Sequence, residues 1–312
     1  MKLKFVDMKI KHIIQKVLIA ILLVSAVSYS QQDPQYTQYM YNTMSVNPGY
    51  AGSMDHLVVN ALHRSQWVGL DGAPKTQTLG LHAPFKKNVG LGLSIINDNL
   101  GPANETFVDA NFSYTLQTSD NNKLAFGLKA GARFFDVDFS KGLYQVPEPM
   151  LDQNINEVFL TIGAGFFYYS DKWYVGLSVP NFMTNSYFDN INVSIDKERL
   201  HYYLIGGYVF DLNDKIKFKP AVLTKAVSGA PWIADLSANF LFNEKFTLGA
   251  AYRWDDSVSA LAGFQINQNL NIGYAFDNTT SNLRHYNNGT HEFMLRYEFI
   301  KKASIIKSPR FF

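Results

Sequence analysis

The sequence predicts an all-β protein, an antiparallel transmembrane β-barrel of the outer membrane with about 14 strands. Three observations support this prediction. Apolar and polar residues alternate along most of the chain, as in strands with two unlike faces. The alternating segments are mostly 9–13 residues long, near the length of a tilted transmembrane strand. Short polar turns alternate with longer connections along the chain, as in outer-membrane barrels.

The first 30 residues are typical of a secretory signal peptide. Five lysines precede an apolar run over residues 17–27, and Ser28 and Ser30 supply the small residues before a cleavage site at Gln31. The run is too short for a membrane-spanning helix, which needs about 20 residues. We therefore expect residues 1–30 to direct export through the inner membrane and to be removed.

Residues 31–56 precede the first predicted strand. Four side chains lie at helical spacing and could line one side of a short helix: Tyr36, Tyr39, Met40 and Met44. Asn47-Pro48-Gly49 would end that helix. A lumen formed by about fourteen strands needs filling unless water occupies it. This aromatic segment is therefore expected either in the periplasm or as a plug in the lumen.

The barrel is expected over residues 57–299. In residues 104–117, for example, Val108 and Phe112 share one face, whereas Asp109 and Asn111 share the other. Fourteen such segments begin near Leu57, Lys75, Asn88, Asn104, Asn122, Asn156, Lys172, Arg199, Ile216, Trp232, Lys245, Ser257, Leu270 and His291. A count between 12 and 16 would also satisfy the pattern. Glycines on the polar faces are expected to leave room for a curved wall and crowded lumen side chains.

The connections between the segments differ by side. Short turns follow the even-numbered segments, for example at residues 119–121, 170–171, 213–214, 243–244 and 267–269. Longer loops follow most odd-numbered segments, at residues 66–74, 98–103, 138–154, 181–197 and 278–289, with the break at 255–256 as an exception. Short turns are periplasmic in such barrels and long loops are extracellular. An even strand count places both barrel ends in the periplasm, followed by a basic tail at residues 300–312.

A large soluble β-sandwich is the alternative fold, because its strands also alternate. The segments here are longer than the usual five or six residues of soluble strands. Aromatic side chains also gather near segment ends, as in the interfacial belts of membrane proteins, for example Tyr168, Trp173 and Trp254. Both features favour the barrel.

The sequence contains no catalytic motif. It has no cysteine, which excludes zinc–thiolate sites, iron–sulfur ligation and cysteine nucleophiles. His291-Glu292 resembles the start of a zinc-protease motif, but position 295 is Leu rather than His. We therefore expect a non-enzymatic protein with no catalytic residue, no metal ligand and no cofactor.

The charges expected in the lumen are of mixed sign. The main candidates are Lys129, Arg133, Asp235, Arg253 and Arg296. They could form a salt-bridged interior that holds the barrel or a plug, or a selectivity lining for a solute. Without residues 1–30 the chain keeps 23 basic and 25 acidic residues, so no basic surface indicates nucleic acid.

The start of the mature chain resembles the PorP/SprF family. The resemblance is carried by residues 31–42, which read QQDPQYTQYMYN, by Val46-Asn47-Pro48-Gly49-Tyr50-Ala51-Gly52, by Arg64-Ser65-Gln66-Trp67 and by Gly289-Thr290-His291-Glu292. It extends over about residues 31–299. It points to family-motif residues as candidate partner contacts: Tyr36, Gln38, Tyr39, Asn47, Pro48, Gly49, Arg64 and Trp67.

The resemblance implies an outer-membrane component of the type IX secretion system of Bacteroidetes. Such a protein would assist the secretion and surface attachment of proteins with a C-terminal sorting domain, including gliding adhesins. The implied partners are the secreted protein, periplasmic secretion and motility components, and outer-membrane lipid. The alternative is an outer-membrane channel for a small or hydrophobic solute.

Overall fold

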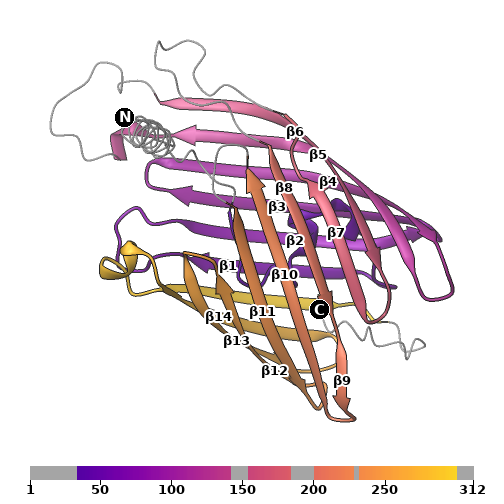
Figure 1. The fold of residues 1–312 in the computed structure, drawn as a ribbon. Helices are drawn as coiled ribbons and strands as arrows, with labels where there is room; N and C mark the ends of the chain where they lie inside the picture. The colour runs from indigo at the N-terminus through magenta and orange to yellow at the C-terminus, as the bar shows by residue number, and fades with distance from the viewer. Residues whose placement is uncertain (1–33, 142–153, 184–199, 228–231, 301–312) are drawn as a thin grey trace, which may run out of the picture.

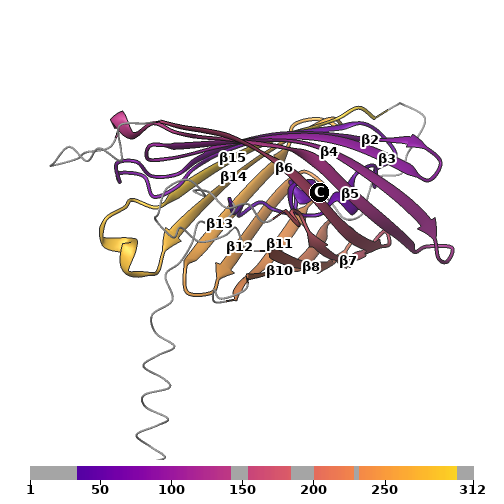
Figure 2. The ribbon, with the colours of Figure 1, turned by 90° about the horizontal axis from the view of Figure 1, so that it is seen from above.

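The structure, a computed structural model, describes residues 34–141, 154–183, 200–227 and 232–300. The expected signal peptide and basic tail lie outside these residues. All described strands belong to one antiparallel sheet, which curves into a closed wall around a central space (Figures 1 and 2). Among the described residues, no helix is long and apolar enough to cross a bilayer.

Strands that follow each other in the sequence pair side by side, except that β8 and β9 both pair with β10. Because β1 also pairs with β15, the wall is closed. The strands are β1 Val58–Ser65, β2 Lys75–Lys86, β3 Val89–Leu100, β4 Ala103–Gln117, β5 Lys123–Val137, β6 Ile155–Tyr169, β7 Trp173–Val179, β8 His201–Tyr208, β9 Phe210–Asn213, β10 Ile216–Val227, β11 Ile233–Phe242, β12 Phe246–Arg253, β13 Ser257–Gln265, β14 Leu270–Thr279 and β15 Thr290–Glu298. Because β8 and β9 both pair with β10, they form one strand of the wall. The predicted antiparallel barrel of about 14 strands is confirmed.

The break between β8 and β9 lies opposite Pro220 of β10. Gly207 pairs with Ala221, and Phe210 pairs with Phe218, so the residues between them face Pro220 and its neighbour. Proline has no N–H group to donate to a sheet ladder. The ladder is therefore interrupted at this place, although sequence alternation continues through it.

The wall is apolar outside and polar inside. In β4, Val108 and Phe112 are exposed, whereas Asp109, Asn111 and Ser113 are buried. Most other strands follow the same arrangement, with Leu, Ile, Val, Phe or Tyr among their exposed side chains, whereas all four residues of β9 are exposed. A surface of this kind suits a hydrocarbon environment, and the closed sheet satisfies the backbone groups internally. The protein is located in the outer membrane.

The connections sort by side largely as expected, with one correction. Residues 98–103 were expected to form a longer loop, but β3 runs to Leu100 and β4 starts at Ala103. The side-chain amide of Asn97 donates to Asn104 and Thr106 on the opposite strand, both at 2.8 Å. These polar residues therefore extend the hairpin, and Gly101, with a φ of 57°, makes its tight turn.

The short helix expected from the spacing of Tyr36, Tyr39, Met40 and Met44 is reduced to a single turn. Residues 37–41 form turns, and only Thr43–Val46 form the single helical turn α2. A 3₁₀ turn, η1, follows at Pro48–Tyr50. Two more 3₁₀ turns lie in loops, η2 at Phe139–Lys141 and η4 at Asn282–His285. The conformation of residues 36–50 therefore depends mainly on packing against the wall rather than on helical hydrogen bonds.

Candidate functional site

The candidate functional site is the barrel lumen together with residues 34–56, called the lumen segment below. Figure 2 shows this indigo segment enclosed by the wall. Tyr39 and Tyr50 are each 1% exposed, and the segment contributes half of the buried residues of the main hydrophobic cluster. The lumen is therefore occupied by aromatic and Met side chains of the chain itself.

The lumen segment runs from one end of the barrel to the other. Its beginning lies near the long loops, where the Tyr36 hydroxyl is 3.1 Å from Thr78 Oγ1 of β2. Its end lies near the short turns, where Ser113 of β4 donates to the Ala51 carbonyl at 2.5 Å. With long loops outside, the segment starts at the extracellular mouth and descends to the periplasmic mouth, where β1 begins.

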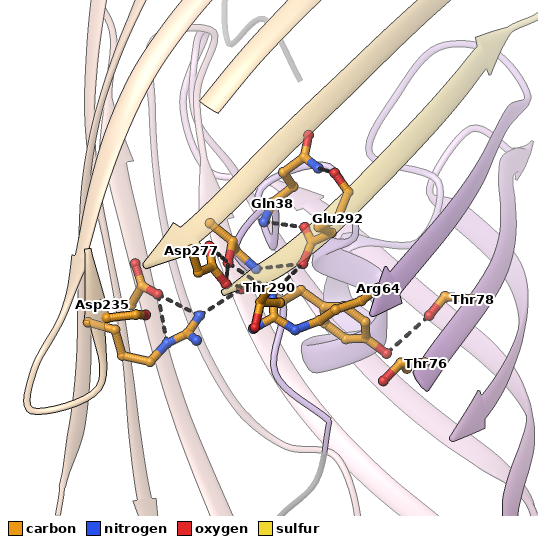
Figure 3. Close-up of polar contacts among 12 residues, drawn as sticks. Gln38, Arg64, Thr76, Thr78, Asp235, Asp277, Thr290 and Glu292 are labelled. Carbon is orange, nitrogen blue, oxygen red and sulfur yellow. Dashed lines mark hydrogen bonds and ion pairs between the residues drawn. The ribbon is translucent and has the colours of Figure 1, made fainter. Parts of the chain in front are cut away.

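Two carboxylates of adjacent strands hold the extracellular start of the segment (Figure 3). Glu292 of β15 accepts the backbone N–H groups of Thr37 at 3.0 Å and of Gln38 at 2.7 Å. Asp277 of β14 accepts the Thr37 hydroxyl at 2.8 Å. Arg64 of β1 lies 2.8 Å from Asp277 and 2.9 Å from Glu292, and all three side chains are nearly fully buried. The wall therefore binds the segment through charge-assisted hydrogen bonds, which are stronger than neutral ones.

A second ion pair lies beside the first. Arg253 of β12 donates to Asp235 of β11 at 2.9 and 3.1 Å, and also to the Tyr36 carbonyl at 3.3 Å. Asp235 and Arg253 are direct partners in the hairpin register. Their facing positions could have been found from the sequence by counting outward from the short turn at 243–244. The contact with Tyr36 depends on the tertiary structure.

The other cationic side chains that the sequence predicts in the lumen also pair with carboxylates. Lys129 lies 2.8 Å from Asp109, and Arg133 lies 2.7 Å from Glu105. Arg296 lies 2.7 Å from Glu298 near the periplasmic end. Buried charges need partners of this kind, because an unpaired charge in a dry interior is strongly destabilising. The geometry fits a salt-bridged interior better than a free selectivity lining.

Asn47 fastens the middle of the lumen segment. Its Oδ1 accepts the Gly49 N–H at 2.9 Å, and its Nδ2 donates to the Phe166 carbonyl of β6 at 2.9 Å. Several wall glycines make room for this turn, among them Gly176 and Gly127. A Cβ at Gly176 would lie 2.6 Å from Asn47 Nδ2, and a Cβ at Gly127 would overlap the backbone of Gly49. The glycines on the polar faces therefore receive the segment, a role that alternation alone did not reveal.

The family-motif residues are mostly internal. Seven of them are buried within the barrel: Tyr36, Gln38, Tyr39, Asn47, Pro48, Gly49 and Arg64. Trp67 is half-buried in the first extracellular loop, where its N–H donates to Thr290 at 3.1 Å. Direct contact between the seven buried residues and another protein would require the segment to leave the lumen.

The described side chains of the interior pack together and pair their charges. In the part of the chain that the structure describes, no group of three or more His, Asp or Glu side chains is placed to hold a metal ion. His291, considered above for a zinc motif, lies 2.7 Å from the hydroxyl of Tyr274. Its ring therefore belongs to a cross-strand aromatic contact.

Comparison with known proteins gives one family match. The family model described as "Type IX secretion system membrane protein PorP/SprF" matches residues 28–297. A search of curated proteins found no match. Solved structures with a similar course include a Pseudomonas aeruginosa FadL homologue, at 13% identity and a TM-score of 0.47, covering 86% of this chain and 95% of that one. The Ralstonia pickettii toluene transporter TbuX is 10% identical with a TM-score of 0.48, covering 83% and 93%.

Proposed function

Because the chain belongs to the PorP/SprF family of type IX secretion system membrane proteins, we propose that it acts as a non-enzymatic docking platform in the outer membrane. In this role it assists the secretion and surface attachment of proteins that carry a C-terminal sorting domain, such as gliding adhesins. The family match over residues 28–297 is the observation that carries the secretion role. The filled lumen supports docking rather than conduction.

The lumen argues against passage of a protein through this barrel. The lumen segment is bound to the wall by Glu292, Asp277 and Ser113, among others. A folded domain could enter only if this segment and its ion pairs were displaced. The secreted protein is therefore expected to contact the outside of the platform and to cross the membrane elsewhere.

The extracellular end offers side chains for such a contact. Phe182, Trp254 and Tyr286 lie in or beside extracellular connections and are exposed. Most of the loops at 138–154 and 181–197, including Tyr144 and Tyr187, lie outside the described residues. At the other end, the short turns and the exit of the lumen segment face the periplasm and its secretion and motility components.

The proposal is tested by purifying the tagged protein from outer membranes in mild detergent and identifying the copurifying proteins by mass spectrometry. We expect a large surface protein with a C-terminal sorting domain, periplasmic motor-linked proteins, or both. A clean barrel without partners that forms discrete conducting channels in planar bilayers would instead support a channel for a small or hydrophobic solute.

Deleting residues 31–56 tests the role of the lumen segment within this proposal. The truncated barrel should still insert, because β1 and β15 close the wall without it. It should lose secretion of its cargo and gain conductance. Normal secretion by an inserted, truncated protein would show that the segment has no part in the function.

A further inference from the structure

The periplasmic mouth contains a cavity of about 540 Å³ beside the exit of the lumen segment. One side is formed by residues 52–55 of that segment, and another by the β2–β3 turn at Lys86, Lys87 and Asn88. Inward-facing positions at the ends of β4, β5 and β6 complete it, including Gln117 and Lys123. The cavity therefore lies inside the rim of the barrel, next to the plugged lumen.

The charge of this cavity is positive and unbalanced. Lys86, Lys87 and Lys123 line it, against one carboxylate, Asp55. Within the described chain, none of these three lysines forms an ion pair, whereas Lys129 and Arg133 of the lumen are paired with carboxylates. Lys86 instead lies 5.6 Å from the centre of the Phe85 ring. The cavity therefore presents free ammonium groups to a ligand from the periplasm.

We propose that this cavity binds an acidic peptide segment of a periplasmic protein. Several converging cations favour carboxylates, since complementary charge steers and orients a binding partner. The polar side chains of Thr115 and Gln117 also line the cavity, and they supply hydrogen-bonding groups for a peptide chain. A membrane phospholipid is a poorer fit, because its acyl chains lie outside the wall whereas Thr115, Gln117 and Lys123 face inward.

This inference deepens the proposed function by naming the chemistry of one periplasmic partner, and it rests on that function only for the identity of the partner. The cavity and its charge do not depend on which protein is secreted. Peptide binding by the purified barrel and secretion by cells can therefore fail separately, and each failure has its own meaning.

The first experiment measures binding of a fluorescein-labelled deca-glutamate peptide to the full-length mature barrel in detergent, by anisotropy at low salt. The variant Lys87→Gln/Lys123→Gln should weaken binding at least fivefold. The control Lys215→Gln/Lys245→Gln removes two exposed lysines from other periplasmic turns and should change binding less than twofold. Equal weakening by both variants, or by neither, would overturn the assignment of the site.

The second experiment places a photo-crosslinking residue at Gln117 in cells and identifies its adducts by mass spectrometry. We expect adducts with a segment rich in Asp and Glu, and their loss when Lys87→Gln/Lys123→Gln is added. The Lys215→Gln/Lys245→Gln control should retain them. Adducts with lipid, or with neutral peptides insensitive to the lysines, would refute the proposal. If the Lys87→Gln/Lys123→Gln variant lost its adducts but cells still secreted the cargo normally, the peptide site would stand and only its role in secretion would be contradicted.

Discussion

The carboxylate of Glu292 accepts the backbone N–H of Gln38 at 2.7 Å, so the last strand of the wall holds the first turn of the lumen segment. The two residues are 254 positions apart in the chain. The contact therefore joins the segment before the first strand to the last strand, and β1 and β15 are the pair that closes the wall. Occupation of the lumen and closure of the barrel are linked through one buried side chain.

Replacing Glu292 with Gln should loosen the lumen segment. The change keeps the shape but removes the charge that Arg64 and two backbone N–H groups share. A hydrogen bond to a charged group contributes about 1.5–3 kcal/mol. The free energy for local opening should fall by that amount, which corresponds to a labelling rate about 10–100-fold higher at a cysteine introduced at Ser45.

The measurement is clean because the chain has no cysteine of its own. Glu157→Gln is the matched control, since Glu157 is exposed on β6. It should leave the labelling rate unchanged. If Glu292→Gln also left the rate unchanged, the lumen segment would be held by other contacts.

Gly127→Ala should displace the middle of the lumen segment. The new Cβ would overlap the backbone of Pro48 and Gly49, which cannot move aside as a flexible side chain can. We expect the Ser45→Cys label to react faster while the barrel still inserts and keeps its heat-modifiable migration on gels. Gly206→Ala is the control, because its Cβ would meet no atom closer than 3.5 Å. Identical labelling of the two variants would disprove the docking role of Gly127.

Leu128→Arg should destabilise the barrel in lipid vesicles by about 2–4 kcal/mol, the usual cost of a cation on the lipid face near the bilayer midplane. Leu128 is 59% exposed in the middle of β5. Leu128→Ala separates the effect of charge from lost apolar area. Urea unfolding in vesicles measures both variants. Equal stability of the Arg and Ala variants would mean that this face does not contact hydrocarbon.

The orientation of the barrel is tested from outside intact cells. A cysteine at Tyr286, between β14 and β15, should react with a bulky membrane-impermeant maleimide. A cysteine at Asp214, in the turn between β9 and β10, should react only after the outer membrane is opened. The reverse pattern would place the long loops in the periplasm and would move the start of the lumen segment to that side.

Much of the wall could be predicted from the chain alone, because successive side chains of a strand point to opposite faces and their polarity matches the surroundings of each face. Val108 and Asp109 are neighbours in sequence, yet one faces lipid and the other the lumen. The hairpin at Gly101 was harder to predict, because polar residues such as Asn97 and Asn104 suit a loop as well as a paired strand end. Their hydrogen bond decides between the two.

The interior was less predictable, because its contacts join residues from distant strands. The alternation places glycines such as Gly127 on the polar face, but it does not predict that the backbone of Pro48 and Gly49 packs against Gly127. The spacing of Tyr36, Tyr39, Met40 and Met44 suggested a helix. These side chains are instead buried among several strands, and only one helical turn remains.

The class of fold, the two faces of the wall and the absence of cysteine chemistry can all be read from the chain without a structure. Alternation and turn residues act locally, so they can be recognised without a structure. Three arrangements are visible only in the folded barrel: residues 34–56 occupy the lumen, Arg64 joins Asp277 to Glu292, and three lysines converge at the periplasmic mouth. These arrangements depend on closure of the wall, which brings together residues that are far apart in the chain. Local alternation and turn patterns contain no information about such contacts.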